Sequence, residues 1–219
     1  YVNIAQTIKT PRIRKDSPLP APTVRDIADM YRSISNTSIR GKRDKALLAV
    51  MYSTALRCIS LPRADICDVD FSSGKIRHQP KGHREKDAIA VLSNTAIDAL
   101  KDYLAARGPV SDSDPLFAPV GNRHSRSGHL TTKSMRSMVL ILSEAAGLAR
   151  RDSEGKIANP GHYSAHSIRR AAVTEAAEKL GMDVAQTLAG HASVDTTRCA
   201  YARINRYRQL QATARILDL

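Results

Sequence analysis

Residues 75–92 of this chain read KIRHQPKGHREKDAIAVL. Two short runs, 75–79 and 87–92, flank a segment that is rich in Lys and Arg and contains Pro80 and Gly82. This pattern is typical of a β-hairpin with a basic tip. Just upstream, apolar residues stand among acids over 66–71, and the turn-forming Ser-Ser-Gly of residues 72–74 follows. The sequence therefore predicts a small antiparallel sheet of about three strands.

On both sides of this sheet, apolar residues recur with the spacing of amphipathic helices. Thr23 is the expected N-cap of the first helix, and Asn94 is the candidate N-cap of the helix that follows the sheet. Alternating strand–helix units are absent, which argues against nucleotide-binding α/β folds. The expected class is mainly α with a small three-stranded antiparallel sheet. Helices other than the one after Asn94 are expected near residues 24–34, 41–56, 131–147, 164–180, 183–189, 194–200 and 203–217.

The charge of the chain points to a polyanionic partner. Its 219 residues include 34 Lys and Arg against 21 Asp and Glu, a net charge of +13. The excess is concentrated in four stretches, and clustered charge attracts phosphate backbones. Only nine Phe and Tyr residues and no Trp are present, which disfavours a protein that stacks single-stranded bases on aromatic rings. The four basic stretches are residues 1–15, 74–86, 120–136 and 198–208.

Composition and known motifs exclude several other classes. No apolar run is long enough to span a membrane, and no signal peptide is expected. Three cysteines, with no C-x-x-C, argue against a disulfide framework and fit a reducing cytoplasm. The phosphate-binding glycine motifs of ATP and NAD enzymes are missing. His162 and His166 are four apart, but a third ligand is lacking, so no metal and no cofactor are expected.

Two motifs in the last third of the chain contain candidate site residues. Ser164 can cap a helix on which His166 and Arg169 share a face, close to backbone N–H groups that favour an anion. The alternative is a solvated basic helix start. The Gly190-His191 pair comes 21 residues later, and Tyr201 follows ten residues after that. Taken alone, these would be a turn and a core tyrosine.

In this order, the motifs resemble those of the catalytic domain of tyrosine recombinases, the phage-integrase type of site-specific DNA recombinase. The sequence Ala55-Leu56-Arg57 is similar to the first arginine motif of that family. The segment 81–86 is similar to its hairpin lysine segment, and His166-Ser167-Ile168-Arg169 matches its H-x-L-R box. Residues 188–201, which contain Leu-Ala-Gly-His, Thr-Thr and a tyrosine, resemble its last box. The resemblance covers about residues 20–217.

The resemblance implies a role for six residues. Tyr201 would be the nucleophile that attacks a DNA phosphorus, and Arg57 and Arg169 would hold the non-bridging oxygens. Two guanidiniums suit this task because they are permanently charged and bind oxygen pairs in a bidentate manner. A covalent phosphotyrosine conserves the energy of the phosphodiester, so that rejoining needs neither metal nor ATP.

The other three residues would handle protons and further hydrogen bonds. Lys81 would protonate the leaving 5′ oxygen, His166 would assist proton transfer, and His191 would hydrogen-bond the phosphate.

Three departures from the family pattern stand out. Ser60 occupies a position that is often Glu or Asp, and a serine cannot orient Arg57 by charge. The interval from His191 to the tyrosine is ten residues where many members have nine, which leaves Tyr207 as a second candidate nucleophile. Arg170 stands where a further His is common.

The resemblance also implies an organisation and an assembly. Residues 1–20 are expected to be a basic, Pro-containing linker from an absent N-terminal DNA-binding domain, and residues 21–219 a catalytic domain with a C-terminal helix. The partner would be double-stranded DNA, bound by a homotetramer on paired sites, with a monomer possible without DNA. The last helix would dock either on its own domain or on a neighbour. DNA recombination or integration for a mobile element is the expected activity.

Two alternatives remain open from the sequence. One is a type IB topoisomerase, which uses the same chemistry to relax supercoils. The other is a catalytically inactive DNA-binding module of the same fold, which would fit Ser60 and the ten-residue interval.

Overall fold

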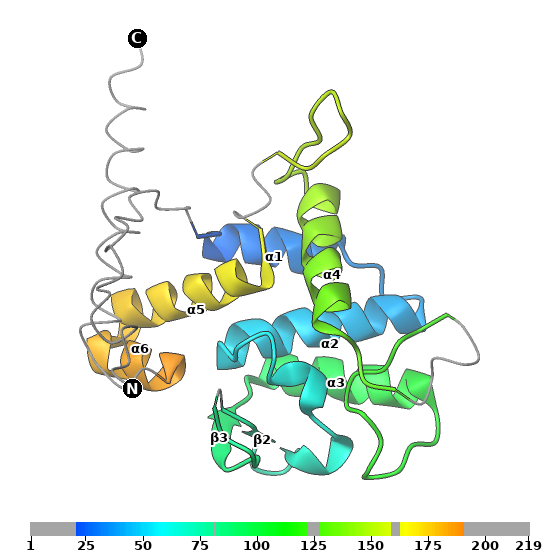
Figure 1. The fold of residues 1–219 in the computed structure, drawn as a ribbon, viewed down its shortest axis with the longest axis vertical. Helices are drawn as coiled ribbons and strands as arrows, with labels where there is room; N and C mark the ends of the chain where they lie inside the picture. Colours follow the sequence, from blue (N-terminus) through cyan, green and yellow to red (C-terminus); the bar gives the residue numbers. More distant parts are fainter. Residues whose placement is uncertain (1–20, 81, 122–127, 159–162, 191–219) are drawn as a thin grey trace, which may run out of the picture.

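The computed structural model describes residues 21–80, 82–121, 128–158 and 163–190 (Figure 1). The expected class, mainly α with a three-stranded antiparallel sheet, is confirmed. The linker expected over 1–20 and the helices expected near 194–200 and 203–217 lie outside the described residues. The described helices are α1 (Val24–Ser33), α2 (Ile39–Thr54), α3 (Asn94–Arg107), α4 (Thr132–Ala145), α5 (Ala165–Leu180) and α6 (Met182–Ala189).

The sheet has the order β1-β2-β3, with both neighbouring pairs antiparallel. Ile76 is fully buried and pairs with Val69 on one side and Ala90 on the other. The turn between β1 and β2 contains Gly74, whose φ of +65° lies in the left-handed region that favours glycine. The strands are β1 (Val69–Asp70), β2 (Lys75–His78) and β3 (Ala88–Val91), and the short 3₁₀ helices η2 (Leu61–Arg63) and η3 (Ile66–Asp68) precede them.

Helix starts follow the capping chemistry of their sequences, with one correction. Thr23 and Ser164 cap α1 and α5 as expected, each within a reciprocal capping box. The N-cap of α3 is Ser93 and not Asn94: the Ser93 hydroxyl accepts a hydrogen bond from the backbone N–H of Ala96 at 3.2 Å. Serine and asparagine are about equally good caps, so the sequence alone did not decide between neighbours.

Helix α2 is the centre of the fold. It packs against α1, α3, α5 and the β3 strand, and Figure 1 shows it between the layer of α1 and α5 and the layer of α3 and the sheet. Its Leu47, Leu48 and Val50 are completely buried. A smaller cluster of mostly alanine side chains joins α5 to α6 and to Ala55. Because these side chains are small, the backbones can pack closely, and the C-terminal ends of α2 and α6 lie against α5.

Candidate active site

The first arginine motif forms a sharp turn at the end of α2. Ala55 follows the helix with a φ of +48°, a left-handed conformation that is unfavourable for a residue with a Cβ. The turn continues with a hydrogen bond from the Ser60 N–H to the Arg57 carbonyl at 2.9 Å. Arg57 is half-buried. The backbone of this turn thus holds Arg57 close to α5.

Arg169 lies on α5, beside this turn, and is only 7% exposed. Its two terminal nitrogens donate hydrogen bonds to the carbonyls of Ala55 and Ala189, at the ends of α2 and α6. Burial lowers the pKa of Arg169 to about 10, and the positive charge of Arg57 contributes to this shift. A guanidinium with a pKa of about 10 is still charged at neutral pH. Its remaining N–H groups can bind an anion.

Both arginines line one cavity of about 630 Å³ (other lining residues include His78, Pro80 and Gly190). Within the described parts of the chain, neither guanidinium has a carboxylate partner. Two unneutralised guanidiniums in one cavity provide strong donors for the oxygens of a phosphate group. The arrangement therefore fits an anion, and the arginine pairing expected from the sequence is present.

Of the other four predicted site residues, the structure describes only His166. Lys81, His191 and Tyr201 lie outside the described residues. The described neighbours of the first two, Pro80 and Gly190, both line the cavity. His166 is exposed in the first turn of α5 and is absent from the described lining of the cavity.

His78, at the end of β2, was not singled out from the sequence. It lines the cavity with Arg57 and Arg169. Burial lowers its pKa, and the charges of the two arginines lower it further, against the opposing effects of the Gln79 backbone and Asp87. The ring is therefore mostly neutral at pH 7. The alternation of strand residues was the available signal, since it places His78 on the face of the buried Ile76.

Ser60, the departure from the usual acid, is 3% exposed and has a structural partner. Its hydroxyl donates a hydrogen bond to the backbone carbonyl of Gln79 at 2.9 Å. Gln79 immediately follows β2. The serine therefore ties the arginine turn to the hairpin, a contact that an ionised carboxylate could not make because it has no proton to donate.

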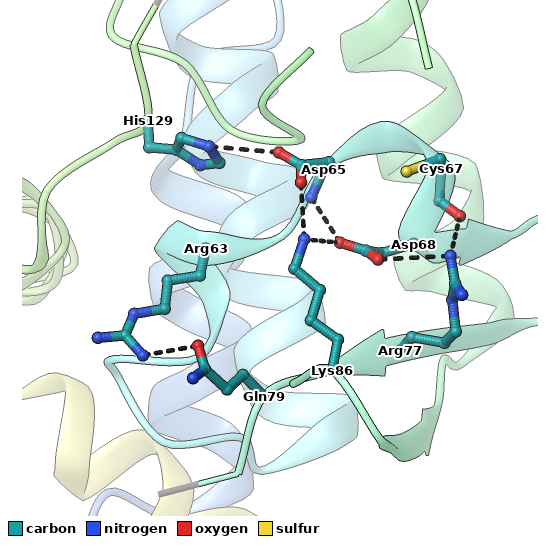
Figure 2. A network of polar contacts seen from close by, with 8 residues as sticks. All are labelled: Arg63, Asp65, Cys67, Asp68, Arg77, Gln79, Lys86 and His129. Carbon is teal, nitrogen blue, oxygen red and sulfur yellow. Dashed lines mark hydrogen bonds and ion pairs between the residues drawn. The ribbon is translucent and has the colours of Figure 1, made fainter. Parts of the chain in front are cut away.

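Lys86, part of the basic hairpin expected to face a polyanion, is held by two carboxylates (Figure 2). Its ammonium contacts Asp65 at 2.6 Å and also contacts Asp68. Burial by itself lowers the pKa of Lys86, but the hydrogen bonds and charges of the two aspartates raise it overall. His129 contacts the other oxygen of Asp65 at 3.2 Å, and Arg77 lies 3.6 Å from Asp68. Part of the positive charge of the hairpin is thus used inside the protein.

Lys86→Met is expected to lower the free energy of unfolding by about 1–3 kcal/mol, because it leaves the buried carboxylate of Asp68 without its main cation. Urea unfolding followed by circular dichroism measures the change. Lys156→Met is the matched control: its ion pair with Glu154 is exposed on both sides, so a change below about 0.5 kcal/mol is expected. Equal losses in the two variants would contradict the structural role of Lys86.

Comparisons with known proteins identify the family of this chain. The model of the phage integrase family matches residues 23–208. The chain belongs to the phage integrase family. It is 27% identical over 211 residues to the tyrosine recombinase XerC of Corynebacterium efficiens, across 95% of this chain and 61% of that protein. The XerC of Pelobacter propionicus is 31% identical over 161 residues, across 72% of this chain and 47% of that protein. The chain therefore spans about half to three-fifths of the length of these relatives.

Solved recombinases share the fold of this phage integrase domain. The crystal structure of XerA recombinase superposes with a TM-score of 0.66 at 21% identity, covering 88% of this chain and 65% of XerA. The XerH site-specific recombinase, solved bound to its palindromic difH substrate after cleavage, gives a TM-score of 0.65 at 20% identity, covering 91% of this chain and 54% of XerH. Among the described helices of this chain, none combines the length and apolar character needed to cross a membrane.

Proposed function

We propose that this chain is the catalytic part of a site-specific DNA recombinase or integrase that cleaves and rejoins DNA through a covalent 3′-phosphotyrosine. The observation that carries the proposal is the pair Arg57 and Arg169 in one cavity without carboxylate partners among the described residues. A phosphodiester brings negative charge, and no carboxylate is among the described residues that line the cavity. Membership of the phage integrase family supports the same chemistry.

The proposed reaction needs neither metal nor ATP. The oxygen of Tyr201 attacks phosphorus, its proton leaving with the help of His166, and the bond from phosphorus to the 5′ oxygen breaks. Lys81 gives a proton to that leaving oxygen. Arg57, Arg169 and His191 hold the phosphoryl oxygens, where negative charge accumulates in the transition state. The reverse reaction, with a new 5′ hydroxyl, rejoins the strand and releases the tyrosine.

The proposed partner is double-stranded DNA, bound by a homotetramer on paired sites. Solved relatives of similar fold include XerH bound to difH and a lambda integrase dimer bound to a core site. The Pro-containing residues 1–20 are proposed to link this domain to an N-terminal DNA-binding domain, and the last helix to dock within or between protomers.

Covalent trapping tests the proposed chemistry. The protein is mixed with labelled duplexes from the flanks of its native locus, intact or nicked, and the mixture is separated on a denaturing gel. A protease-sensitive band of protein–DNA adduct is the expected result. DNA that binds on native gels but never forms an adduct, on every duplex from the locus, would contradict the enzyme and favour the inactive DNA-binding module.

A plasmid without the native locus separates the recombinase from a type IB topoisomerase. A recombinase is expected to leave its supercoils intact, since cleavage waits for a specific site. Relaxation of this plasmid by the wild-type protein would favour the topoisomerase.

A further inference from the structure

Three described residues on the two sides of position 81, Gln79, Pro80 and His83, are joined by hydrogen bonds. The side-chain amide of Gln79 donates a hydrogen bond to the backbone carbonyl of His83 at 2.5 Å. The N–H of His83 in turn donates to the carbonyl of Pro80 at 3.2 Å. The side chain of Gln79, at the end of β2, thus bridges the two sides of the loop over positions 80–83.

The same glutamine is also bonded to the arginine turn. Its backbone carbonyl accepts from the buried Ser60 hydroxyl at 2.9 Å, and its Oε1 accepts from Arg63 at 2.7 Å (Figure 2). Arg63 can only donate and the His83 carbonyl can only accept, so the oxygen of the Gln79 amide faces Arg63 and its nitrogen faces His83. Ser60 is itself bonded to the Arg57 carbonyl. A short chain of hydrogen bonds therefore runs from the Arg57 turn through Gln79 to the far side of the hairpin turn.

We infer that Gln79 is a positioning residue, which holds His83, on the far side of the hairpin turn, at a fixed place relative to the Arg57 turn. The inference rests on the proposed function, in which Arg57 holds the phosphate and Lys81 protonates the leaving 5′ oxygen. Those two tasks must be performed on neighbouring atoms of one phosphodiester, so the distance between the two turns decides the rate. Gln79 touches no reacting atom, and it acts only through the residues to which it is bonded.

Ser60 adds a second connection between the Arg57 turn and the hairpin. With a carboxylate at that position, the contact to the Gln79 carbonyl would lack a proton. In this chain the hydroxyl donates instead, and the connection between the two turns is made through a neutral hydrogen bond. This bond depends on the proton of Ser60 and on the backbone of position 79, while the side chain of Gln79 adds separate bonds to Arg63 and His83.

A substrate with a sulfur leaving group isolates proton delivery. At the cleavage position mapped by covalent trapping, the bridging 5′ oxygen is replaced by sulfur. When the tyrosine oxygen bonds to phosphorus, the phosphorus–sulfur bond breaks and a thiolate leaves with the electron pair. A thiol has a pKa of about 8.5, so the thiolate is a stable leaving group that needs no proton. A variant that fails only in proton delivery is then restored.

Gln79→Met, which keeps the length of the side chain but removes the amide, is compared with wild type in single-turnover cleavage. On ordinary DNA we expect a loss of about 10- to 100-fold, because a displaced general acid forfeits much of its contribution. On the sulfur substrate we expect a rate within about threefold of wild type, and native-gel binding within about twofold, since the phosphate contacts remain. Gln79→Glu, which keeps an acceptor for Arg63 but loses the donor to His83, is expected to behave in the same way.

Lys81→Ala on both substrates separates this inference from the proposed function. Rescue of Lys81→Ala by sulfur without rescue of Gln79→Met would overturn the inference and leave the proton donor in place. Failure of sulfur to rescue Lys81→Ala would overturn the assignment of Lys81, and the inference with it. Wild-type rates for both Gln79 variants on ordinary DNA would also overturn it. Rescue of all three variants is the supporting result.

Discussion

Tyr201→Phe is expected to abolish covalent capture of DNA while leaving non-covalent binding nearly unchanged. The substitution removes one oxygen, the atom proposed to bond to phosphorus, and it leaves the charge of the protein unaltered. Binding to DNA comes mainly from contacts of basic side chains with phosphates, so its affinity is expected to stay within about twofold. Denaturing gels measure the covalent adduct and native gels measure binding, on the same labelled duplex.

Tyr207→Phe is the matched control, because it makes the same chemical change six residues further along the chain. Its adduct is expected to form at the wild-type rate. An adduct that persists in Tyr201→Phe and disappears in Tyr207→Phe would move the nucleophile to Tyr207. The interval of ten residues between His191 and Tyr201 would then have no catalytic meaning. A loss of binding in Tyr201→Phe as large as the loss of cleavage would show that the assignment of the nucleophile is wrong.

The fold was predictable because its local signals agree with its long-range packing. The hairpin over 75–92 combines strand patterns with turn residues, and the capping residues Thr23 and Ser164 mark helix starts that the structure confirms. The exception, Ser93 in place of Asn94, is a shift by one position between two residues of similar capping strength. Where two neighbours satisfy the same hydrogen bond, only the three-dimensional structure decides between them.

The sequence predicts the site as a set of motifs, and it does not predict the contacts among the described residues. The resemblance to the family implies that Arg57 and Arg169 hold the same phosphate, and the structure places both on one cavity. The hydrogen bond between Ser60 and Gln79 joins positions 19 residues apart, and no periodicity in the sequence reports it. The charge count likewise included Lys86 in a basic stretch expected to attract phosphates, because a count does not show that Asp65 and Asp68 face it.

Arg169→Ala is expected to slow covalent cleavage by about 10²–10³-fold, the usual cost of removing one preorganised donor from developing negative charge. The residue also donates hydrogen bonds to the carbonyls of Ala55 and Ala189, so the alanine variant is expected to lose stability as well. Urea unfolding gives that loss separately from the rate. Arg151→Ala serves as the control, since its exposed pair with Glu144 lies outside the described lining of the cavity.

Arg169→Lys isolates the role of charge, and its rate is expected to depend on pH in a specific direction. Burial and the charge of Arg57 bring the pKa of the native arginine down to about 10 from an ordinary value of 12.5. A lysine begins near 10.4, so the same surroundings lower its pKa toward neutrality, and it loses its proton as the pH rises. Single-turnover cleavage by Arg169→Lys is therefore expected to fall between pH 7 and 9 relative to wild type, whose arginine stays mostly charged over that range. A constant ratio of the two rates across this range would mean that the cavity does not depress the pKa of a cation at this position, and that arginine is required there for its geometry alone.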